Sequence, residues 1–265
     1  MKFLKKVLIA IITLGVVTGI GASVTQAAAA SQSAKSELKN KGTLTIGLEG
    51  TYSPYSYRKN GKLTGFEVDL GKAVAKKMGL KAKFVPTKWD SLVAGLGSGK
   101  FDVVMNNITR TPERAKQYNY SIPYIKSRYI LIVPSNSKIK NIKQIKGKKI
   151  VAGIGTNNAD VAKKYGATIV PNGDFATALG MVKQHRADGE INSREAWYAY
   201  RQKNSTKGLK AIDISKYQKP AKISALFNKK DTAIQASYNK AMRELQKDGT
   251  VKKLSTKYFG TDITK

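Results

Sequence analysis

Arg114 is the residue whose position in the sequence most directly suggests binding chemistry. Thr111 and Pro112 precede it, and Thr followed by Pro is typical of the N-cap and first position of a helix. Arg114 then falls at the third helical position, where its charge opposes the helix dipole. A guanidinium can hold a carboxylate through two parallel hydrogen bonds, so the pattern favours a carboxylate-binding arginine over a surface arginine. Arg110 is expected to be solvated.

A second anion-binding element is predicted at Gly155-Thr156-Asn157. This segment precedes a predicted helix at 158–165, and the N–H groups of a first helical turn have no acceptor within the helix. They would donate hydrogen bonds to an anion bound at that end of the helix. The alternative is an ordinary glycine turn before a helix.

The amino-acid composition excludes several other chemistries. The 265 residues include no Cys and one His, His185, so disulfides, thiolate or multi-histidine metal centres, a cysteine nucleophile and a lipid-modified cysteine are ruled out. The carboxylates are scattered, no Ser/His/Asp order could work with His185, and no glycine-rich phosphate loop is present. We therefore expect a protein that is not an enzyme and needs no metal or cofactor.

Charge and the N-terminal segment predict where the protein works. The 48 Lys and Arg against 17 Asp and Glu give a net charge of +31, spread along the chain rather than concentrated on one element. This spread argues against nucleic-acid binding and predicts salt-dependent attraction to polyanions. Residues 1–30 resemble a secretory signal, with a basic start, an apolar run at 7–24 and small residues at 27–30. The alternative is an uncleaved membrane helix. We expect a secreted protein, retained at the cell surface by charge.

The order of the predicted elements indicates an α/β protein, because strand and helix patterns alternate along the chain. A first run has a Tyr-, Ser- and Pro-rich loop at 50–60, a helix that ends at Gly79, and strands at 44–48, 81–86 and 101–105. A second run follows residue 124, with short helices between strands at 129–133, 149–152, 168–170 and 189–191. A strand at 223–227 and two amphipathic helices complete the chain.

Residues 65–78, GFEVDLGKAVAKKM, resemble the signature of the bacterial extracellular solute-binding proteins of family 3, the polar-amino-acid capture subunits of ABC importers. Further segments similar to the family follow in the expected order, at 95–102, 108–114, 120–124, 155–157, 188–192, 248–250 and 257–260. The resemblance covers about residues 42–262. Within the family it extends to cystine-binding members and to lactobacillar surface proteins described as collagen- or mucus-binding.

The resemblance implies a two-lobed periplasmic-binding-protein-like fold of type II with two hinge crossovers. After the signal peptide, lobe 1 would comprise residues 42–124 and 223–265, and lobe 2 would comprise residues 125–222. The crossovers would lie near 124–128 and 219–222, with the ligand between lobes that close like a hinge. We expect a monomer.

The resemblance also implies which residues hold the carboxylate and the side chain of a bound amino acid. Arg114 matches the family's carboxylate-binding arginine, and Thr156 and Asn157 would add N–H groups from the other lobe. Tyr52 and Trp89 match positions where the family places aromatic rings over the ligand side chain. Such rings suit a flat, apolar or sulfur-bearing group; either residue could instead belong to the core.

The ligand ammonium group has several candidate partners. The Thr109 hydroxyl and the Asn107 backbone carbonyl lie at family positions for this contact. The family's second-lobe aspartate, however, falls on Ser193 in this sequence. A buried ammonium without a charged partner is costly, so either Ser193 accepts a neutral hydrogen bond or Glu190 or Glu49 supplies the negative charge.

Two functional hypotheses from different classes follow. The first is a non-enzymatic protein that captures an amino acid, with cystine as the best guess, and delivers it to the membrane subunits of an ABC importer. The second is a cationic cell-surface adhesin that binds collagen, mucin or wall polymers. A dehydratase is disfavoured because the carboxylates are scattered.

Overall fold

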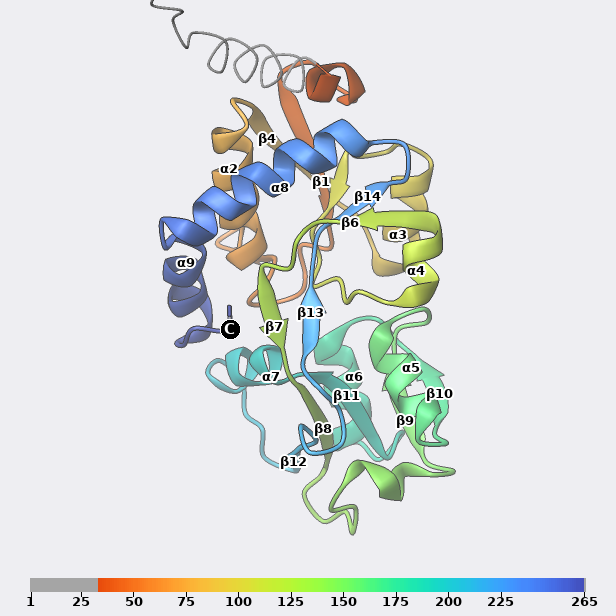
Figure 1. Cartoon of the computed structure of the whole chain (residues 1–265). Coiled ribbons are helices and arrows are strands. Elements are labelled where there is room, and N and C mark those ends of the chain that lie inside the picture. The colour runs from red at the N-terminus through yellow and green to blue at the C-terminus, as the bar shows by residue number, and fades with distance from the viewer. Residues whose placement is uncertain (1–32, 265) are drawn as a thin grey trace, which may run out of the picture.

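The computed structural model describes residues 33–264 of the chain. The predicted signal peptide at 1–30 lies outside these residues. Two α/β lobes, each built around a five-stranded sheet, are stacked end to end (Figure 1). Within residues 33–264, none of the helices combines the length and the apolar character needed to cross a membrane.

Lobe 1 contains the sheet with strand order β4-β1-β5-β14-β6. Its strands are β1 Thr43–Leu48, β4 Lys81–Pro86, β5 Val103–Val104, β6 Tyr118–Tyr120 and β14 Leu226–Asn228. Its helices are α2 Phe66–Lys77, α3 Trp89–Gly97, α4 Pro112–Gln117, α8 Thr232–Lys247 and α9 Thr250–Phe259. β1 pairs in parallel with β4 and β5. Its five residues after Thr43 are all buried, as expected for a central parallel strand covered on both faces.

Lobe 2 contains the sheet with strand order β10-β9-β11-β8-β12. Its strands are β8 Tyr129–Pro134, β9 Lys149–Ala152, β10 Thr168–Pro171, β11 Gly189–Ser193 and β12 Leu209–Asp213. Its helices are the 3-10 helix η1 Ile142–Ile145 and α5 Asn157–Lys164, α6 Phe175–Lys183 and α7 Arg194–Arg201. All five residues of β11 are buried, and this strand carries several residues of the site described below.

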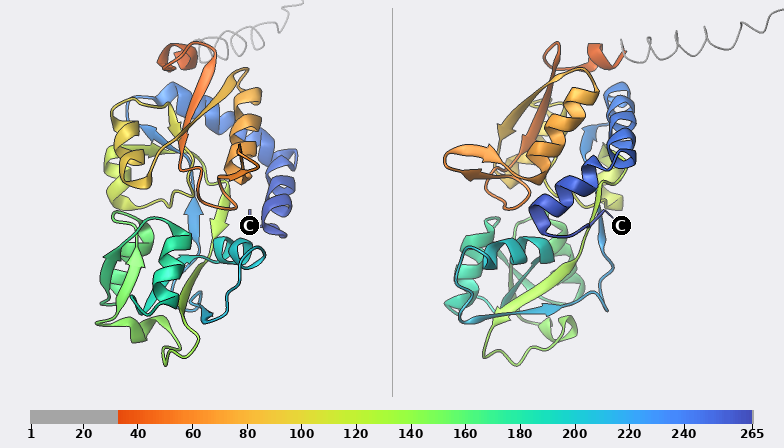
Figure 2. Two further views of the ribbon diagram at one scale, coloured as in Figure 1. Left: turned by 180° about the vertical axis from the view of Figure 1, so that it is seen from behind. Right: turned by 90° about the vertical axis from the view of Figure 1, so that its left-hand side faces the viewer.

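Two short antiparallel strands connect the lobes. β7 Ile125–Ser127 pairs with β13 Ala221–Ile223, with Ile125 opposite Ile223 and Ser127 opposite Ala221. Both run from one sheet toward the other (Figure 1), and Figure 2 shows from the side that α9 reaches the junction of the lobes. Because the chain crosses twice, lobe 1 is built from both the early and the late parts of the sequence.

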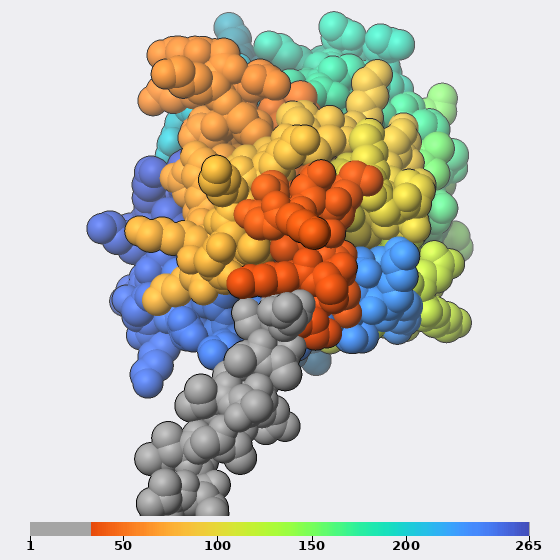
Figure 3. Space-filling view, turned by 90° about the horizontal axis from the view of Figure 1, so that it is seen from above, coloured from red at the N-terminus to blue at the C-terminus, as the bar shows by residue number. Residues whose placement is uncertain are grey.

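The segment before β1 is more structured than its polar composition suggests. Residues 33–37 form a helical turn that lies on the end of lobe 1 (Figure 3). The Glu37 carboxylate accepts hydrogen bonds from the backbone N–H groups of Ala233 (3.2 Å) and Ile234 (2.8 Å). These groups belong to the first turn of α8, whose own N-cap Asp231 makes no side-chain cap bond. Glu37 therefore caps α8 from a distant part of the sequence.

Several strands differ from the sequence-based expectation. The loop predicted at 50–60 contains the start of a hairpin, β2 Tyr57–Lys59 with β3 Lys62–Thr64. Its turn residues Asn60 and Gly61 both have positive φ (51° and 74°), which is what a two-residue hairpin loop requires. The strand predicted at 223–227 is divided between β13 and β14, and β6 and β12 were not predicted.

Glu67 in α2 is a fully buried carboxyl group in lobe 1. Its Oε1 accepts hydrogen bonds from the Asn107 backbone N–H (2.8 Å) and the Tyr124 hydroxyl. Its Oε2 is buried without a hydrogen-bond partner among the described residues. Burial raises the pKa of Glu67 to about 7, because the charged form is poorly solvated there.

Folding stability is therefore expected to fall as pH rises through the pKa of Glu67. The folded chain binds this proton more tightly than the unfolded chain does, so the contribution is complete below pH 4.5 and is lost toward pH 7. The size is on the order of 3 kcal/mol. Urea unfolding at about pH 5 and pH 8 should show a smaller decrease for Glu67→Gln than for the native chain. Equal decreases in the two proteins would contradict the assignment.

Candidate functional site

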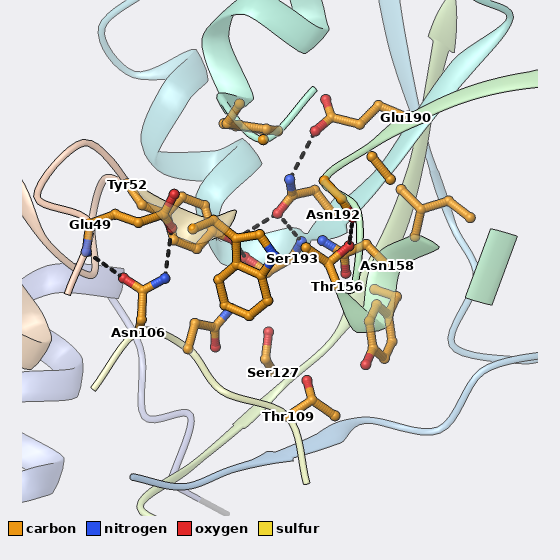
Figure 4. A pocket seen from close by; sticks show the side chains of 18 of the residues that line it. Glu49, Tyr52, Asn106, Thr109, Ser127, Thr156, Asn158, Glu190, Asn192 and Ser193 are labelled. Carbon is orange, nitrogen blue, oxygen red and sulfur yellow. Dashed lines mark hydrogen bonds between the residues drawn. The ribbon is translucent and has the colours of Figure 1, made fainter. Parts of the chain in front are cut away.

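A polar cavity lies between the two lobes (Figure 4). The volume open to the centre of a water molecule is about 80 Å³, and one water needs roughly 10–15 Å³ of such volume. The closed cleft therefore has room for a small group of atoms. Lobe 1 contributes Glu49, Tyr52, Trp89, Asn106, Asn107 and Thr109. The connecting strands and lobe 2 contribute Ser127, Ala221, Tyr129, Ala152, Gly153, Thr156, Asn158, Asn172, Gly173, Phe175, Glu190, Ile191, Asn192 and Ser193.

Hydrogen bonds from lobe 1 to lobe 2 hold the cleft closed. The Trp89 indole Nε1 donates to the Ile154 carbonyl (2.9 Å). The Tyr52 hydroxyl donates to Asn192 Oδ1 (2.7 Å). The Tyr52 and Trp89 side chains, both predicted to face a ligand, thus line the cavity and also join its two walls.

Arg114 occupies the helix position expected from the sequence. Thr111 is the N-cap of α4, Pro112 is its first residue, and the Thr111 hydroxyl accepts a hydrogen bond from the Arg114 backbone N–H. The guanidinium donates to the carbonyls of Thr109 (3.1 Å) and, across the cleft, Gly155 (2.7 Å). The guanidinium carbon Cζ of Arg114 lies 5.4 Å from the centroid of the Trp89 ring. Arg114 does not line the cavity in this closed arrangement.

The N-terminus of α5 faces the cavity. Thr156 is the N-cap; its hydroxyl accepts from the Ala159 N–H (3.2 Å) and donates to the Gly153 carbonyl (2.7 Å). The helix begins at Asn157, one residue earlier than predicted. The Asn157 side chain donates to the Tyr129 hydroxyl and does not line the cavity, whereas Asn158 does.

Ser193 is committed to structural contacts. It is the N-cap of α7, and its hydroxyl accepts from the Ala196 N–H (3.1 Å). The Tyr55 hydroxyl donates to the same oxygen (3.3 Å), and the Tyr52 hydroxyl lies 3.4 Å away. An additional ammonium donor would have to compete with these groups for one oxygen.

Two carboxyl groups line the cavity. Glu49 is half-buried, and its Oε2 accepts from Asn106 Nδ2 (2.6 Å). Glu190 is 3% exposed, its Oε1 accepts from Asn192 Nδ2 (2.9 Å), and its Oε2 is buried without a hydrogen-bond partner among residues 33–264. Burial raises the pKa of both carboxyl groups, and that of Glu190 by much more.

Within residues 33–264, the side chains that line the cavity include no Lys, Arg or His, although the chain carries a net charge of +31. The carboxyl groups of Glu49 and Glu190 can therefore face a cationic group of a ligand, while the N-terminus of α5 can face an anionic one. Among the described residues there is no cluster of three or more His, Cys, Asp or Glu side chains suited to a metal ion.

Eight of the ten candidate residues from the sequence line this one cavity: Glu49, Tyr52, Trp89, Asn107, Thr109, Thr156, Glu190 and Ser193. Arg114 and Asn157 lie beside it and contact its lining residues. Sequence reasoning missed Asn106, Asn158, Asn192, Tyr129 and Phe175. Asn106, Asn158 and Asn192 adjoin predicted site residues, which was a usable signal, while Phe175 offered none.

Two α/β lobes joined by paired strands, with a polar cavity enclosed between them, define a hinged ligand-binding protein. The family model for bacterial extracellular solute-binding proteins, family 3, matches residues 44–261. The chain belongs to this family, as its resemblance in motifs predicted.

Individual relatives agree with this membership. The L-cystine-binding protein TcyA of Bacillus subtilis is 36% identical over 232 residues, which cover 86% of this chain and 85% of the relative. An ancestral arginine-binding protein bound to arginine superposes with a TM-score of 0.75 at 34% identity, covering 83% of this chain and 99% of the other.

The conformation can be compared with a structure described as unliganded and open. The L-cystine solute receptor of Neisseria gonorrhoeae in that state is 38% identical to this chain. The match covers 88% of this chain and 99% of the receptor, but the TM-score is only 0.59. The arginine-bound structure has a higher TM-score, 0.75, although its sequence identity is lower, 34%. This difference agrees with the hydrogen bonds across the cleft, which mark the present structure as closed.

Trp89 is expected to report ligand binding through its fluorescence. It lines the cavity, whereas the other tryptophan, Trp197, is 4% exposed within lobe 2. Ligand-induced change in emission should therefore vanish in Trp89→Phe and persist in Trp197→Phe. Loss of the indole hydrogen bond to Ile154 should also weaken binding by roughly 3- to 10-fold, the worth of one net hydrogen bond. A signal lost in Trp197→Phe instead would contradict this placement.

Proposed function

We propose that the protein captures a free amino acid between its lobes and delivers it to the membrane subunits of an ABC importer. The observation that carries the proposal is the enclosed cavity, which combines a helix N-terminus, aromatic rings and two carboxyl groups. L-Cystine is the first candidate ligand, because an L-cystine-binding protein and an L-cystine solute receptor are 36% and 38% identical to this chain.

The ligand carboxylate is assigned to the N-terminus of α5 and to Arg114. The first-turn N–H groups of Asn157 and Asn158 have no acceptor within the helix, and they favour an anion. Arg114 bonds to Gly155 across the cleft in the closed form. Opening the lobes separates these partners, so the guanidinium becomes free to receive a carboxylate before closure.

The ligand ammonium is assigned to acidic and carbonyl oxygens rather than to Ser193. Ser193 already accepts hydrogen bonds from Ala196 and Tyr55. Asn107 Oδ1 and Glu190 Oε2 are buried oxygens of cavity-lining residues that lack a partner among residues 33–264. An ammonium between such oxygens would keep its hydrogen bonds and gain a counter-charge.

A larger ligand has a path out of the small cavity. Phe175 lines both this cavity and a larger one of about 670 Å³ beside the β2–β3 hairpin. One half of a two-headed amino acid such as cystine can occupy the first cavity while the other half extends past Phe175. A hinge movement about β7 and β13 would open the cleft and admit such a ligand. In this movement residues 42–124 and 223–265 form one lobe, and residues 125–222 form the other.

Ligand-stripped protein should be screened by thermal unfolding against the common amino acids and L-cystine. A ligand present at 100 times its Kd stabilises the folded state by about 2.7 kcal/mol, which raises Tm by several degrees. The proposal predicts such a shift for L-cystine or a small set of amino acids. No shift for any of them would overturn it.

The proposed role is capture without catalysis. The family is one of solute-binding proteins, and the cavity holds an amino acid through groups that exchange hydrogen bonds rather than form covalent bonds. Incubation of the protein with prephenate-like acids should leave these acids unchanged. Turnover that requires the protein and that Arg114→Ala abolishes would contradict the absence of catalysis. The comparisons give no support to the collagen- or mucin-binding alternative.

We also propose that charge retains the protein at the outer surface of the cell. The family is extracellular, and a chain with a net charge of +31 is attracted to anionic wall polymers or lipid headgroups. Because salt screens such attraction, washing cells with about 1 M salt should release the protein. Retention through that wash would contradict the proposal.

A further inference from the structure

Glu190 stands apart from the other carboxyl groups of the described residues because it is buried and also lines the ligand cavity. Only 3% of the residue is exposed, and Figure 4 shows its side chain in the wall opposite Thr109 and Ser127. Its Oε1 is used by Asn192, but its Oε2 has no hydrogen-bond partner among the described residues. A buried, unpartnered carboxyl oxygen in a binding cavity requires a physical explanation.

The surroundings of Glu190 within residues 33–264 offer no positive charge. Its sheet neighbours are Ile132 of β8 and Val151 of β9, which are apolar. The charged group that acts on it is the Asp174 carboxylate at the start of α6. The negative charges of Glu190 and Glu49 both contribute to raising the pKa of Tyr52, which also lines the cavity. All these groups are neutral or acidic, so they disfavour ionisation of Glu190 in the empty closed cleft.

Resting on the amino-acid-binding function proposed above, we infer that Glu190 is protonated in the unliganded closed cleft and exchanges its proton for a cationic group of the ligand. The O–H bond of the carboxylic acid breaks, the proton passes to solvent, and the resulting carboxylate pairs with a ligand ammonium. Glu190 thereby selects ligands that place an ammonium, either the α-ammonium or a second one, against this wall of the cavity.

The electrostatics agree with the geometry. Burial raises the pKa of Glu190 well above its usual range; the hydrogen bond from Asn192 opposes this in part, and Asp174 reinforces it. A ligand ammonium in contact with Oε2 would lower the pKa again, since an opposite charge stabilises the ionised form. Binding therefore releases a proton, and affinity rises with pH for as long as free Glu190 remains protonated.

The test is a set of calorimetric titrations of the full secreted chain with the amino acid that gives the largest thermal shift. Titrations in two buffers of different ionisation enthalpy, at about pH 6, 7 and 8, give the number of protons released. We expect release approaching one proton per ligand at the lowest pH, and affinity that increases by up to tenfold per pH unit. Glu190→Gln should bind more weakly and release no proton.

Glu195→Gln is the matched control. Glu195 is also buried (4% exposed), burial raises its pKa, and it lies on the neighbouring α7, but it does not line the cavity. This variant should retain the native proton release. Absence of release in the native chain, or equal release from Glu190→Gln, would overturn the inference while leaving amino-acid capture intact. Failure of every amino acid to bind would overturn both.

The ammonium in contact with Glu190 can be the α-ammonium or a second one. Matched ligands with one and two ammonium groups distinguish them: S-methyl-L-cysteine with L-cystine, and L-norleucine with L-lysine. Equal weakening of both members by Glu190→Gln assigns the contact to the α-ammonium. Selective weakening of the two-ammonium member assigns it to the second group, and unchanged affinity for every ligand that binds overturns the inference.

Discussion

Replacing Arg114 with alanine is expected to weaken amino-acid binding by about 100-fold or more. The guanidinium bonds to Thr109 in lobe 1 and to Gly155 in lobe 2, and it packs on the Trp89 ring. The variant therefore loses a closing contact together with the proposed carboxylate contact. Truncating one member of a buried, charge-assisted pair commonly costs about 2–5 kcal/mol. Calorimetric titration with the ligand found by thermal shift measures the loss.

Arg110→Ala is the control for that result. Arg110 is exposed, lies four residues earlier, and contacts lobe 1 through the Ser121 carbonyl (3.5 Å) and the Tyr120 ring. It should change affinity by less than about threefold, as an exposed cation does. Equal losses in the two variants would show that overall charge, rather than the position of Arg114, controls binding.

Replacing Gly65 with alanine is expected to cause the largest loss of stability among single-methyl changes in lobe 1, about 3 kcal/mol or more. Gly65 precedes α2 and has φ of 134°, a conformation that L residues rarely adopt. An added Cβ would lie 2.3 Å from the Tyr55 carbonyl oxygen and 2.9 Å from Ser56 Cα. These are backbone atoms, so relief requires moving the loop that carries Tyr52 and Tyr55.

Gly79→Ala provides the comparison. Gly79 also has positive φ (69°), but an added Cβ there would meet no atom within 4 Å. Gly79→Ala should lower the free energy of unfolding by about 1 kcal/mol, because only the backbone conformation disfavours alanine there. Urea unfolding of both variants gives the difference; similar free energies of unfolding would show that the loop at Tyr55 yields easily and that Gly65 is not a steric requirement.

The sequence predicted those parts of the fold that local patterns determine. β4 and β9 have the predicted bounds because alternation and apolar runs mark them directly. The Thr111 cap was also predicted, since capping depends on a few adjacent residues. β12 at Leu209–Asp213 was missed because a short edge strand in which Lys210 and Asp213 interrupt the apolar residues carries little local signal. The Asn60-Gly61 turn was a usable signal that the loop assignment overlooked.

The candidate site was predicted in its residues more than in its contacts. Tyr55 reaches Ser193 across 138 positions of sequence, and Arg114 reaches Gly155 across 41. Such pairs depend on how the lobes pack, which residue spacing does not encode. The burial of Glu190 likewise depends on distant parts of the chain, because β11 lies between β8 and β9 in the lobe 2 sheet. The sequence left Ser193, Glu49 and Glu190 as alternatives for this reason.

Enclosure of one amino acid between the lobes can be seen in a crystal structure of the protein with the tightest-binding amino acid. We expect one ligand per chain, with its carboxylate at the N-terminus of α5 and an ammonium on Glu190, beneath Trp89. A ligand bound on the outer surface, or a cleft that stays open with the ligand held by one lobe alone, would contradict it.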